Sequence, residues 1–285
     1  MIPGGEYESE KGMLKVHFSL GEIGLCVITG GSSGIGKAFV THLLERYPEI
    51  RIFNLSRSAP EEFKGTTNNI HIPCDLSNDE SKKNAFVELN SLLERHAGLN
   101  KKLLLINNSG FGTYDVFPEP GLQSQLDMVE VNAKAPLWLT GELLPHIKTN
   151  GGAVLNIASI AGFQPAPFFA TYGGTKAFLV SWSLALAEEL RPINIPVLTV
   201  CPGPVHTNFF RSAGFESPPV SKWNGQTPIQ VVEWSLHALE GGRNLIVTGW
   251  NNRILSFFSS LVPRRFIGRI SAFVVKKMRV EQFKK

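Results

Sequence analysis

Short apolar runs alternate with longer amphipathic segments along most of this chain, and the alternation restricts the folds that it can adopt. Seven runs have the length and composition of buried strands, at about 25–29, 51–55, 70–73, 103–106, 153–158, 196–201 and 244–247. Between them, helical periodicity occurs at about 34–47, 78–96, 122–148, 171–190 and 228–240. Strands that alternate with helices pair in parallel, and helices cover both faces of their sheet. The sequence therefore predicts an α/β fold with a doubly wound parallel sheet of about seven strands.

Length and composition predict one folded domain with an extension at each end. Of the 285 residues, 43% are hydrophobic and 18% are charged, which is typical of a globular protein with a sizeable core. We expect a flexible N-terminal extension over 1–22, a single domain over 23–250 and a helical C-terminal extension over 251–285. No apolar run approaches the roughly 20 residues needed to cross a bilayer, and nothing resembles a cleavable signal peptide.

Three cysteines, Cys26, Cys74 and Cys201, lie far apart in or beside predicted strands. They form no CxxC pair and no histidine cluster accompanies them, so we expect buried free thiols and no bound metal. Thiols of this kind fit a reducing compartment. Together with the lack of a signal peptide, they predict a cytoplasmic protein.

A glycine-rich turn, Thr29-Gly-Gly-Ser-Ser-Gly-Ile-Gly36, joins the first predicted strand to the first predicted helix. Glycine permits a tight turn and lets the backbone approach a pyrophosphate, which then lies against amide groups at the helix N-terminus. The position of Gly30, Gly34 and Gly36 therefore predicts a nucleotide site. Because open parallel sheets bind ligands beyond the carboxyl ends of their strands, other motifs that follow strands should join this site.

Tyr172 and Lys176 lie four residues apart in the helix predicted over 171–190, and Ser159 precedes the tyrosine by thirteen residues. On a helix, the tyrosine and the lysine share a face, with about 5–6 Å between their Cβ atoms. At that range an ammonium favours the ionised phenol, so we expect the lysine to lower the tyrosine pKa from its usual value of about 10. Such a pair predicts a general acid/base that works near neutral pH. A surface tyrosine beside a solvated lysine is the alternative, and the other motifs argue against it.

These motifs occur in the order found in the short-chain dehydrogenase/reductase family, which the chain resembles over about residues 24–250. The chain has the GxxxGxG glycine spacing, an Asn-Asn-Ser-Gly motif at 107–110, the serine and YxxxK set at the family's usual interval, and Pro-Gly at 202–203. Ser109 departs from the family, which commonly has alanine there. The resemblance implies a Rossmann-like fold and an oxidoreductase that uses a nicotinamide cofactor for hydride transfer.

The resemblance also implies the roles of individual residues. Tyr172 would give a proton to the carbonyl oxygen during reduction, and Lys176 would hold the nicotinamide ribose and lower the tyrosine pKa. Ser159 would hydrogen-bond the substrate oxygen as charge develops, and Asn132 would anchor a water that connects Lys176 to solvent. The implied cofactor-binding residues are Gly30, Ser32, Ser33, Gly34, Ile35, Gly36, Arg57, Asp75, Leu76, Asn108, Ser109, Gly110, Tyr172, Lys176, Pro202, Gly203, Val205 and Thr207.

Arg57 favours NADP(H) over NAD(H) as the cofactor. Sites for NAD usually place an acidic residue at the end of the second strand, where it holds the ribose 2′-hydroxyl. This chain has Ser56-Arg57 there, and a guanidinium suits a 2′-phosphate. An exposed arginine that merely ends the strand is the alternative. By resemblance, Asp75 and Leu76 contact the adenine, and Thr207 lies near the nicotinamide carboxamide.

Three segments that should surround the nicotinamide, at 111–117, 163–169 and 205–226, are rich in aromatic residues. An apolar pocket of this kind favours a lipophilic ketone, aldehyde or secondary alcohol over a sugar or a charged metabolite. Packing of the loops or of a subunit interface is the alternative for each residue. The stretch after Pro204 contains two glycines and is expected to be a mobile lid. The aromatic residues are Phe111, Tyr114, Phe117, Phe163, Phe168, Phe169, Phe209, Phe210, Phe215 and Trp223.

The C-terminal extension is basic and amphipathic. From Arg243 onward, ten basic residues and one acidic residue give a charge of +9, whereas the other 18 basic and 23 acidic residues give −5. Apolar residues recur at helical spacing on both sides of Pro263, so we expect two short helices. A basic amphipathic helix can lie on an anionic membrane surface, here through 253–280, and packing on its own domain or on a neighbouring subunit is the alternative. We expect no nucleic-acid partner.

The leading functional prediction is an NADP(H)-dependent oxidoreductase that interconverts a hydrophobic ketone or aldehyde and its alcohol. A non-catalytic NADP(H)-binding sensor or scaffold, associated with membranes or partner proteins, is the alternative, and the intact serine, tyrosine and lysine set argues against it. Epimerisation or dehydration is a third possible function, but relatives with those activities usually have other glycine spacings and a larger substrate domain. Family members often pair through the helices that begin here near Leu122 and Thr171, so we expect a homodimer.

Overall fold

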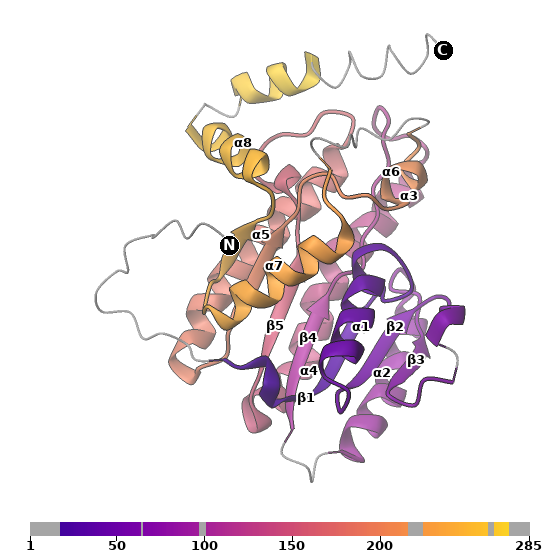
Figure 1. Cartoon of the computed structure of the whole chain (residues 1–285). Helices are drawn as coiled ribbons and strands as arrows, with labels where there is room; N and C mark the ends of the chain where they lie inside the picture. The colour runs from indigo at the N-terminus through magenta and orange to yellow at the C-terminus, as the bar shows by residue number, and fades with distance from the viewer. Residues whose placement is uncertain (1–17, 64, 97–100, 216–224, 262–264, 274–285) are drawn as a thin grey trace.

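Seven parallel strands form one sheet at the centre of the molecule (Figure 1). The structure, a computed structural model, describes residues 18–63, 65–96, 101–215, 225–261 and 265–273. The strands lie in the order β3-β2-β1-β4-β5-β6-β7, and each neighbouring pair is parallel, so the predicted fold class is confirmed. Their bounds are β1 (Ile23–Thr29), β2 (Arg51–Ser56), β3 (Asn69–Pro73), β4 (Lys102–Asn107), β5 (Gly152–Ile157), β6 (Val197–Cys201) and β7 (Leu245–Val247).

Helices cover both faces of this sheet. The helices α1 and α7 supply the core on one face, and α2, α4 and α5 supply it on the other. In β1, Cys26 and Ile28 point into the first core while Leu25 and Val27 point into the second. Because successive strand residues face opposite sides, burial of both sides favours strands that are apolar at most positions. The main helices are α1 (Gly34–Arg46), α2 (Asp79–Glu94), α3 (Leu122–Val129), α4 (Ala135–Asn150), α5 (Ala170–Leu190), α6 (Phe209–Ser212) and α7 (Pro228–Glu240).

The helix predicted over 122–148 is interrupted. Between α3 and α4 the chain forms a π-helical turn, η4 (Glu130–Lys134), in which the hydrogen-bonding pattern widens by one residue. Turns of this type are frequent at functional sites. The turn carries Asn132, whose side chain is fully buried.

The order of the strands creates a crevice at the carboxyl ends of the strands. The first strand, β1, pairs with β2 on one side and with β4 on the other, so the chain proceeds in opposite directions from the middle of the sheet. Loops that leave the carboxyl ends of β1 and β4 therefore diverge toward opposite faces. The motifs that follow these strands converge on this crevice.

The two ends of the described chain differ in how they pack. A 3₁₀ turn, η1 (Leu20–Glu22), precedes β1, and Phe18 and Leu20 are buried in the core beneath α1 and α7. These two residues supply apolar surface to the core and therefore do not belong to the flexible extension predicted over 1–22, of which residues 1–17 lie outside the described residues.

At the C-terminal end, α8 (Trp250–Leu261) follows β7, and residues 265–273 form a further helix. This agrees with the two helices expected on either side of Pro263, although the proline itself lies outside the described residues. Among the residues that the structure describes, no helix has the length and hydropathy needed to cross a membrane.

Candidate active site

A cavity of about 870 Å³ opens at the carboxyl edge of the sheet. Its walls come from the segments that follow β1 to β6, as expected at a topological switch point. All of the site residues predicted from the sequence line this cavity except Gly36 and Asn132. Those two contact residues of its wall.

Backbone geometry explains the glycines of the first turn. Gly30 and Gly34 have φ values of 69° and 55°, in the left-handed region that residues with a Cβ atom seldom occupy. A Cβ atom added to Gly36 would lie 2.2 Å from the carbonyl oxygen of Gly30. Ser33 precedes α1 without a side-chain capping bond, so no capping side chain competes with an anion for the amides of the first helical turn. The turn thus has the features of a phosphate site.

Hydrogen bonds beneath this turn hold β1 and β4 together. The backbone amides of Asn108 and Ser109 both donate to Oγ1 of Thr29 at 3.0 Å, and Nδ2 of Asn108 donates to the Thr29 carbonyl oxygen at 2.9 Å. On the other side, the Gly31 amide donates to Oδ1 of the buried Asn54 at 3.0 Å. The wall of the cavity at this point is therefore preorganised.

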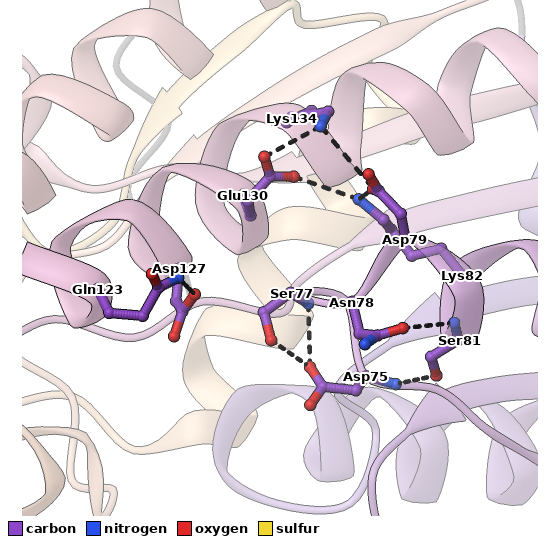
Figure 2. Close-up of polar contacts among 10 residues, drawn as sticks. All are labelled: Asp75, Ser77, Asn78, Asp79, Ser81, Lys82, Gln123, Asp127, Glu130 and Lys134. Carbon is purple, nitrogen blue, oxygen red and sulfur yellow. Dashed lines mark hydrogen bonds and ion pairs between the residues drawn. The ribbon is translucent and has the colours of Figure 1, made fainter.

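The loop after β3 is held by its own hydrogen bonds (Figure 2). Oδ1 of Asp75 accepts from the Ser77 hydroxyl at 2.7 Å and from the Ser77 amide at 2.9 Å, while the Asp75 amide donates to Oγ of Ser81 at 2.9 Å. The two bonds from Ser77, aided by the Arg57 guanidinium, lower the pKa of the Asp75 carboxyl. An ionised carboxylate and an arginine thus share this end of the cavity.

A buried lysine connects this region to the interrupted helix (Figure 2). Lys82 of α2 is 3% exposed, and its Nζ lies 2.7 Å from Oδ1 of Asp79 and 3.2 Å from Oε2 of Glu130. Lys134 approaches the same two carboxylates, at 3.8 Å from Asp79 and 3.0 Å from Glu130. Glu130 and Lys134 begin and end the π-helical turn that carries Asn132. The network therefore fixes this turn against the first turn of α2.

Asn132 holds the loop after β4 with both atoms of its amide. Its Nδ2 donates to the Phe111 carbonyl oxygen at 2.8 Å, and its Oδ1 accepts from the Phe111 amide at 3.0 Å. The same Nδ2 lies 3.2 Å from Oγ1 of Thr175 on α5. In the structure Asn132 therefore positions the β4 loop against α5, and its predicted role in anchoring a water stays a prediction.

Ser159, Tyr172 and Lys176 meet in the cavity. The Ser159 side chain hydrogen-bonds to the Tyr172 hydroxyl, and its Oγ also accepts from the Ala161 amide at 3.1 Å. Lys176 is 4% exposed, and its Nζ donates to the Ile157 carbonyl oxygen at 2.8 Å. The same Nζ lies 5.8 Å from the centre of the Tyr172 ring. The three residue types that the sequence places in order are thus brought together in space.

The expected lowering of the Tyr172 pKa is not found. Burial raises the pKa of Tyr172 to about 12, and the hydrogen bond from Ser159 offsets only part of this rise. Burial likewise lowers the pKa of Lys176 to about 8. Helical spacing indicates that the two side chains are neighbours but not that both are desolvated, and desolvation dominates here. At neutral pH the phenol is therefore protonated, which is the form that can donate a proton.

Aromatic side chains form the wall beside the tyrosine. The rings of Phe169 and Phe209 lie 5.6 and 5.3 Å from that of Tyr172, centre to centre, and behind them Tyr114 stacks on Phe215 at 4.1 Å. This wall is apolar and faces the polar catalytic groups. Of the ten aromatic residues predicted here, four line the cavity, namely Phe111, Phe169, Phe209 and Phe210, and three pack around it, namely Tyr114, Phe168 and Phe215.

The other three aromatic residues do not form this wall. Phe163 joins another core, and Phe117 is 60% exposed. Trp223 lies outside the described residues, as do residues 216–224 of the predicted lid.

The cavity also includes residues that the sequence analysis missed. Asp127 and Val131 reach it from α3 and the π-helical turn, and Asn208 reaches it from the loop before α6. Asp127 accepts a hydrogen bond from Nε2 of Gln123 at 2.8 Å (Figure 2). Asp127 and Val131 are four residues apart, and this spacing is the signal that could have placed both on the cavity side of the helix.

The three cysteines are buried free thiols, as predicted. Burial raises the pKa of Cys74 to about 11 and that of Cys201 to about 12, and it also raises the pKa of Cys26. Within the described ranges, no three His, Cys, Asp or Glu side chains are grouped as they would be around a metal ion.

Known proteins share both the sequence pattern and the fold. A family model for short chain dehydrogenase matches residues 25–216. A very-long-chain 3-oxoacyl-CoA reductase from Phaeosphaeria nodorum is 29% identical over 260 residues, which cover 88% of this chain and 74% of the relative.

Solved structures with 22–23% sequence identity show the same fold. A short chain dehydrogenase from Burkholderia cenocepacia in complex with NADP has a TM-score of 0.69 and 23% identity, covering 90% of this chain and 99% of that one. A 3-ketoacyl-(acyl-carrier-protein) reductase from Brucella melitensis complexed with NADH also has a TM-score of 0.69, with 22% identity, covering 81% of this chain and 98% of that one.

The family model spans more than half of the 285 residues and contains the glycine-rich turn and the Ser159, Tyr172 and Lys176 set. The strand order and the convergence of these motifs on one cavity agree with that match. This chain belongs to the short chain dehydrogenase family, whose members are oxidoreductases that act on carbonyl and alcohol groups.

Proposed function

We propose that this protein is an NADPH-dependent reductase of a lipophilic carbonyl compound, with Tyr172 as the proton donor. The observation that carries the proposal is the half-buried, protonated Tyr172, which is hydrogen-bonded to Ser159 and flanked by the Phe169 and Phe209 rings. A carbonyl oxygen that accepts from both hydroxyls would have its developing charge stabilised and would receive the phenolic proton. The adjoining aromatic wall would hold the apolar part of the substrate.

The residues present fit a nicotinamide nucleotide. The Gly30–Gly36 turn leaves helical amides open to a pyrophosphate, and Asp75 and Leu76 line the same cavity, where they would meet an adenosine. When bound, the reduced nicotinamide supplies the hydride. Lys176, held by the Ile157 carbonyl, would donate to the ribose and keep a positive charge near the tyrosine.

The preference for NADPH rests on Arg57. This residue directly follows β2, lines the cavity and is exposed, so its guanidinium can turn toward a 2′-phosphate. Related solved structures contain either NADP or NADH, so the family alone leaves the choice open.

Replacing Arg57 with Ala is expected to lower kcat/KM for NADPH by roughly 10- to 100-fold, because a charge-assisted hydrogen bond to phosphate is lost. The value for NADH should stay within about twofold. Steady-state kinetics with both cofactors measures this, and Arg57→Lys, which keeps the charge but not the fork of donors, should lie between. Equal losses with both cofactors would show that Arg57 has no role at the 2′ position.

We further propose that the carbonyl compound is an acyl-chain ketone, such as a 3-oxoacyl thioester. Two similar proteins carry names for 3-oxoacyl reductases, one of them for very long chains. The rings of Phe169, Phe209 and Phe210 at the catalytic end of the cavity suit an apolar chain.

A substrate panel tests this proposal. With 3-oxoacyl thioesters of increasing chain length and NADPH, kcat/KM should rise by up to roughly fourfold per methylene until the aromatic wall is filled. The loss of absorbance of the reduced nicotinamide measures turnover, and lipophilic ketones without a thioester serve as controls. Tight NADPH binding without turnover on any carbonyl compound would instead support the non-catalytic sensor.

The predicted homodimer remains a proposal. Apolar side chains suited to such a contact are exposed on three helices, among them Leu126 of α3, Leu137 of α4 and Phe178 of α5. Their exposed fractions lie between 41 and 50%, so a partner subunit on this side would bury substantial apolar area.

A further inference from the structure

Exposed apolar side chains are concentrated at the C-terminal end of the described chain. In α8 and the helix over 265–273, eight large hydrophobic side chains are at least 44% exposed, including Trp250 at 69%, Phe257 at 62% and Phe273 at 74%. The exposed side chains of 250–258 and 265–273 are named the C-terminal patch. In the described chain, 19 large hydrophobic side chains are exposed, and these two short segments hold eight of them. Single exposed apolar residues are ordinary, but such a concentration marks an interaction surface.

The same surface is cationic. Arg253, Arg265 and Arg269 are exposed within the C-terminal patch, and no acidic residue occurs between Trp250 and Phe273. In the part of the chain that the structure describes, none of the three arginines forms an ion pair. The Arg265 guanidinium lies 4.9 Å from the centre of the Phe266 ring, so cation and aromatic ring are presented together.

The C-terminal patch adjoins the wall of the catalytic cavity. Ile267 is buried, and a Cβ atom on Gly268 would lie 3.5 Å from Pro165, whose loop continues into the cavity-lining Ala166 and Phe169. In α8, the Asn252 side chain packs against Gly203, which also lines the cavity. Figure 1 shows α8 and the helix after it beyond the end of the sheet where α6 also lies. The apolar and cationic surface therefore lies beside residues that line the site.

We propose that the C-terminal patch docks on an anionic lipid bilayer and so holds the mouth of the catalytic cavity at the lipid surface. Aromatic and aliphatic side chains interleaved with arginines match a bilayer interface, in which rings enter the acyl boundary while guanidinium groups meet phosphates. A second copy of this chain fits less well, because a two-fold contact would bring the same arginines face to face. The rest of the chain, at −5, would turn away from an anionic surface while the basic end turns toward it.

The proposal is tested by sedimentation of the full chain with two kinds of vesicle, phosphatidylcholine alone and phosphatidylcholine mixed with phosphatidylserine. Binding to the mixed vesicles should exceed binding to the neutral ones and should weaken as salt is raised. The double variant Arg265→Gln/Arg269→Gln should lower the partition coefficient on mixed vesicles by roughly 25-fold, at about fivefold per arginine. The triple variant Phe266→Ser/Ile270→Ser/Phe273→Ser should lower it by roughly 100-fold.

Matched controls separate a local effect from a change in net charge or in folding. Arg46→Gln/Lys148→Gln removes two exposed charges on α1 and α4 and should leave partitioning within about twofold of wild type. Each variant should retain NADPH binding, which shows that the cavity is intact. A wild-type chain that stays in the supernatant with mixed vesicles would overturn the proposal. The proposal would also be overturned if the wild-type chain self-associates and the triple variant alone abolishes this self-association, because the patch would then bind a second copy of the chain. The vesicle measurement needs no carbonyl substrate, so its failure would leave the proposed reaction untouched.

Discussion

The variant Tyr172→Phe is expected to lose carbonyl reduction by a factor of about 10²–10⁴ in kcat, the range that a positioned general acid supplies. The ring is retained, so its contacts with Phe169 and Phe209 and its place beside Lys176 should persist. Binding of NADPH, followed by its fluorescence, should therefore change by less than about twofold. Rapid-mixing kinetics with saturating NADPH and a ketone substrate would measure the loss in the chemical step.

Ser159→Ala provides the companion measurement for Tyr172. It removes the hydroxyl that hydrogen-bonds the phenol but leaves the proton donor itself, so the loss should be smaller, at about 10–10² in kcat, which is the contribution of one hydrogen bond to a charged group. A Tyr172→Phe enzyme that keeps more than a tenth of wild-type kcat would show that the proton comes from another group. A large rise in the Kd for NADPH would show instead that the hydroxyl acts in cofactor binding.

The variant Gly36→Ala is expected to lose both cofactor affinity and stability. The added methyl group would lie 2.2 Å from the Gly30 carbonyl oxygen and 2.4 Å from Nδ2 of Asn108, and both atoms belong to the preorganised wall of the cavity. Relief of such overpacking requires a backbone shift that costs about 1–3 kcal/mol in the free energy of unfolding. The turn would move with it, and the Kd for NADPH should rise by roughly 10- to 100-fold.

Gly141→Ala is the matched control for this variant. Gly141 also lies within a helix, α4, but a Cβ atom there would meet nothing within 4 Å. Because alanine favours a helix over glycine by about 0.5–1 kcal/mol, this variant should be slightly more stable than wild type and should bind NADPH normally. Denaturant unfolding and fluorescence titration on both variants give the comparison. Normal stability and NADPH affinity in Gly36→Ala would show that the turn tolerates a side chain.

The sheet could be predicted because its strands are buried on both faces. Runs such as Leu103–Ile106 are apolar throughout, and burial of both sides of a strand leaves a signal that periodicity detects. The motifs could be predicted to converge at the carboxyl ends of the strands because this follows from the strand order. Strand order in alternating α/β chains is strongly constrained.

The π-helical turn could not be predicted, because Glu130–Lys134 has the composition of an ordinary helix. It makes contacts that are distant in sequence, from Lys82 to Glu130 and from Asn132 to Phe111. The raised pKa of Tyr172 was missed for a similar reason, since desolvation depends on the side chains that surround the ring in space.

A buried polar ladder beneath the site also left no recognisable signal. Nδ2 of Asn107 donates to Oδ1 of Asn156 at 2.8 Å, and Nδ2 of Asn156 donates to Oγ of Ser183 at 2.8 Å. All three side chains are almost completely buried, and the bonds connect β4, β5 and α5. The sequence does not reveal the partner of either asparagine, because each partner lies at least 27 residues away.

The burial of all three native cysteines has a practical consequence for spectroscopy. A maleimide dye reacts with thiolates, and each of these thiols is shielded from solvent with its pKa raised. The unmodified chain should therefore take up very little dye, so a single introduced cysteine can be labelled selectively. A probe attached through Asn251→Cys, at an exposed position on α8, would report the polarity around that helix without any prior removal of natural cysteines.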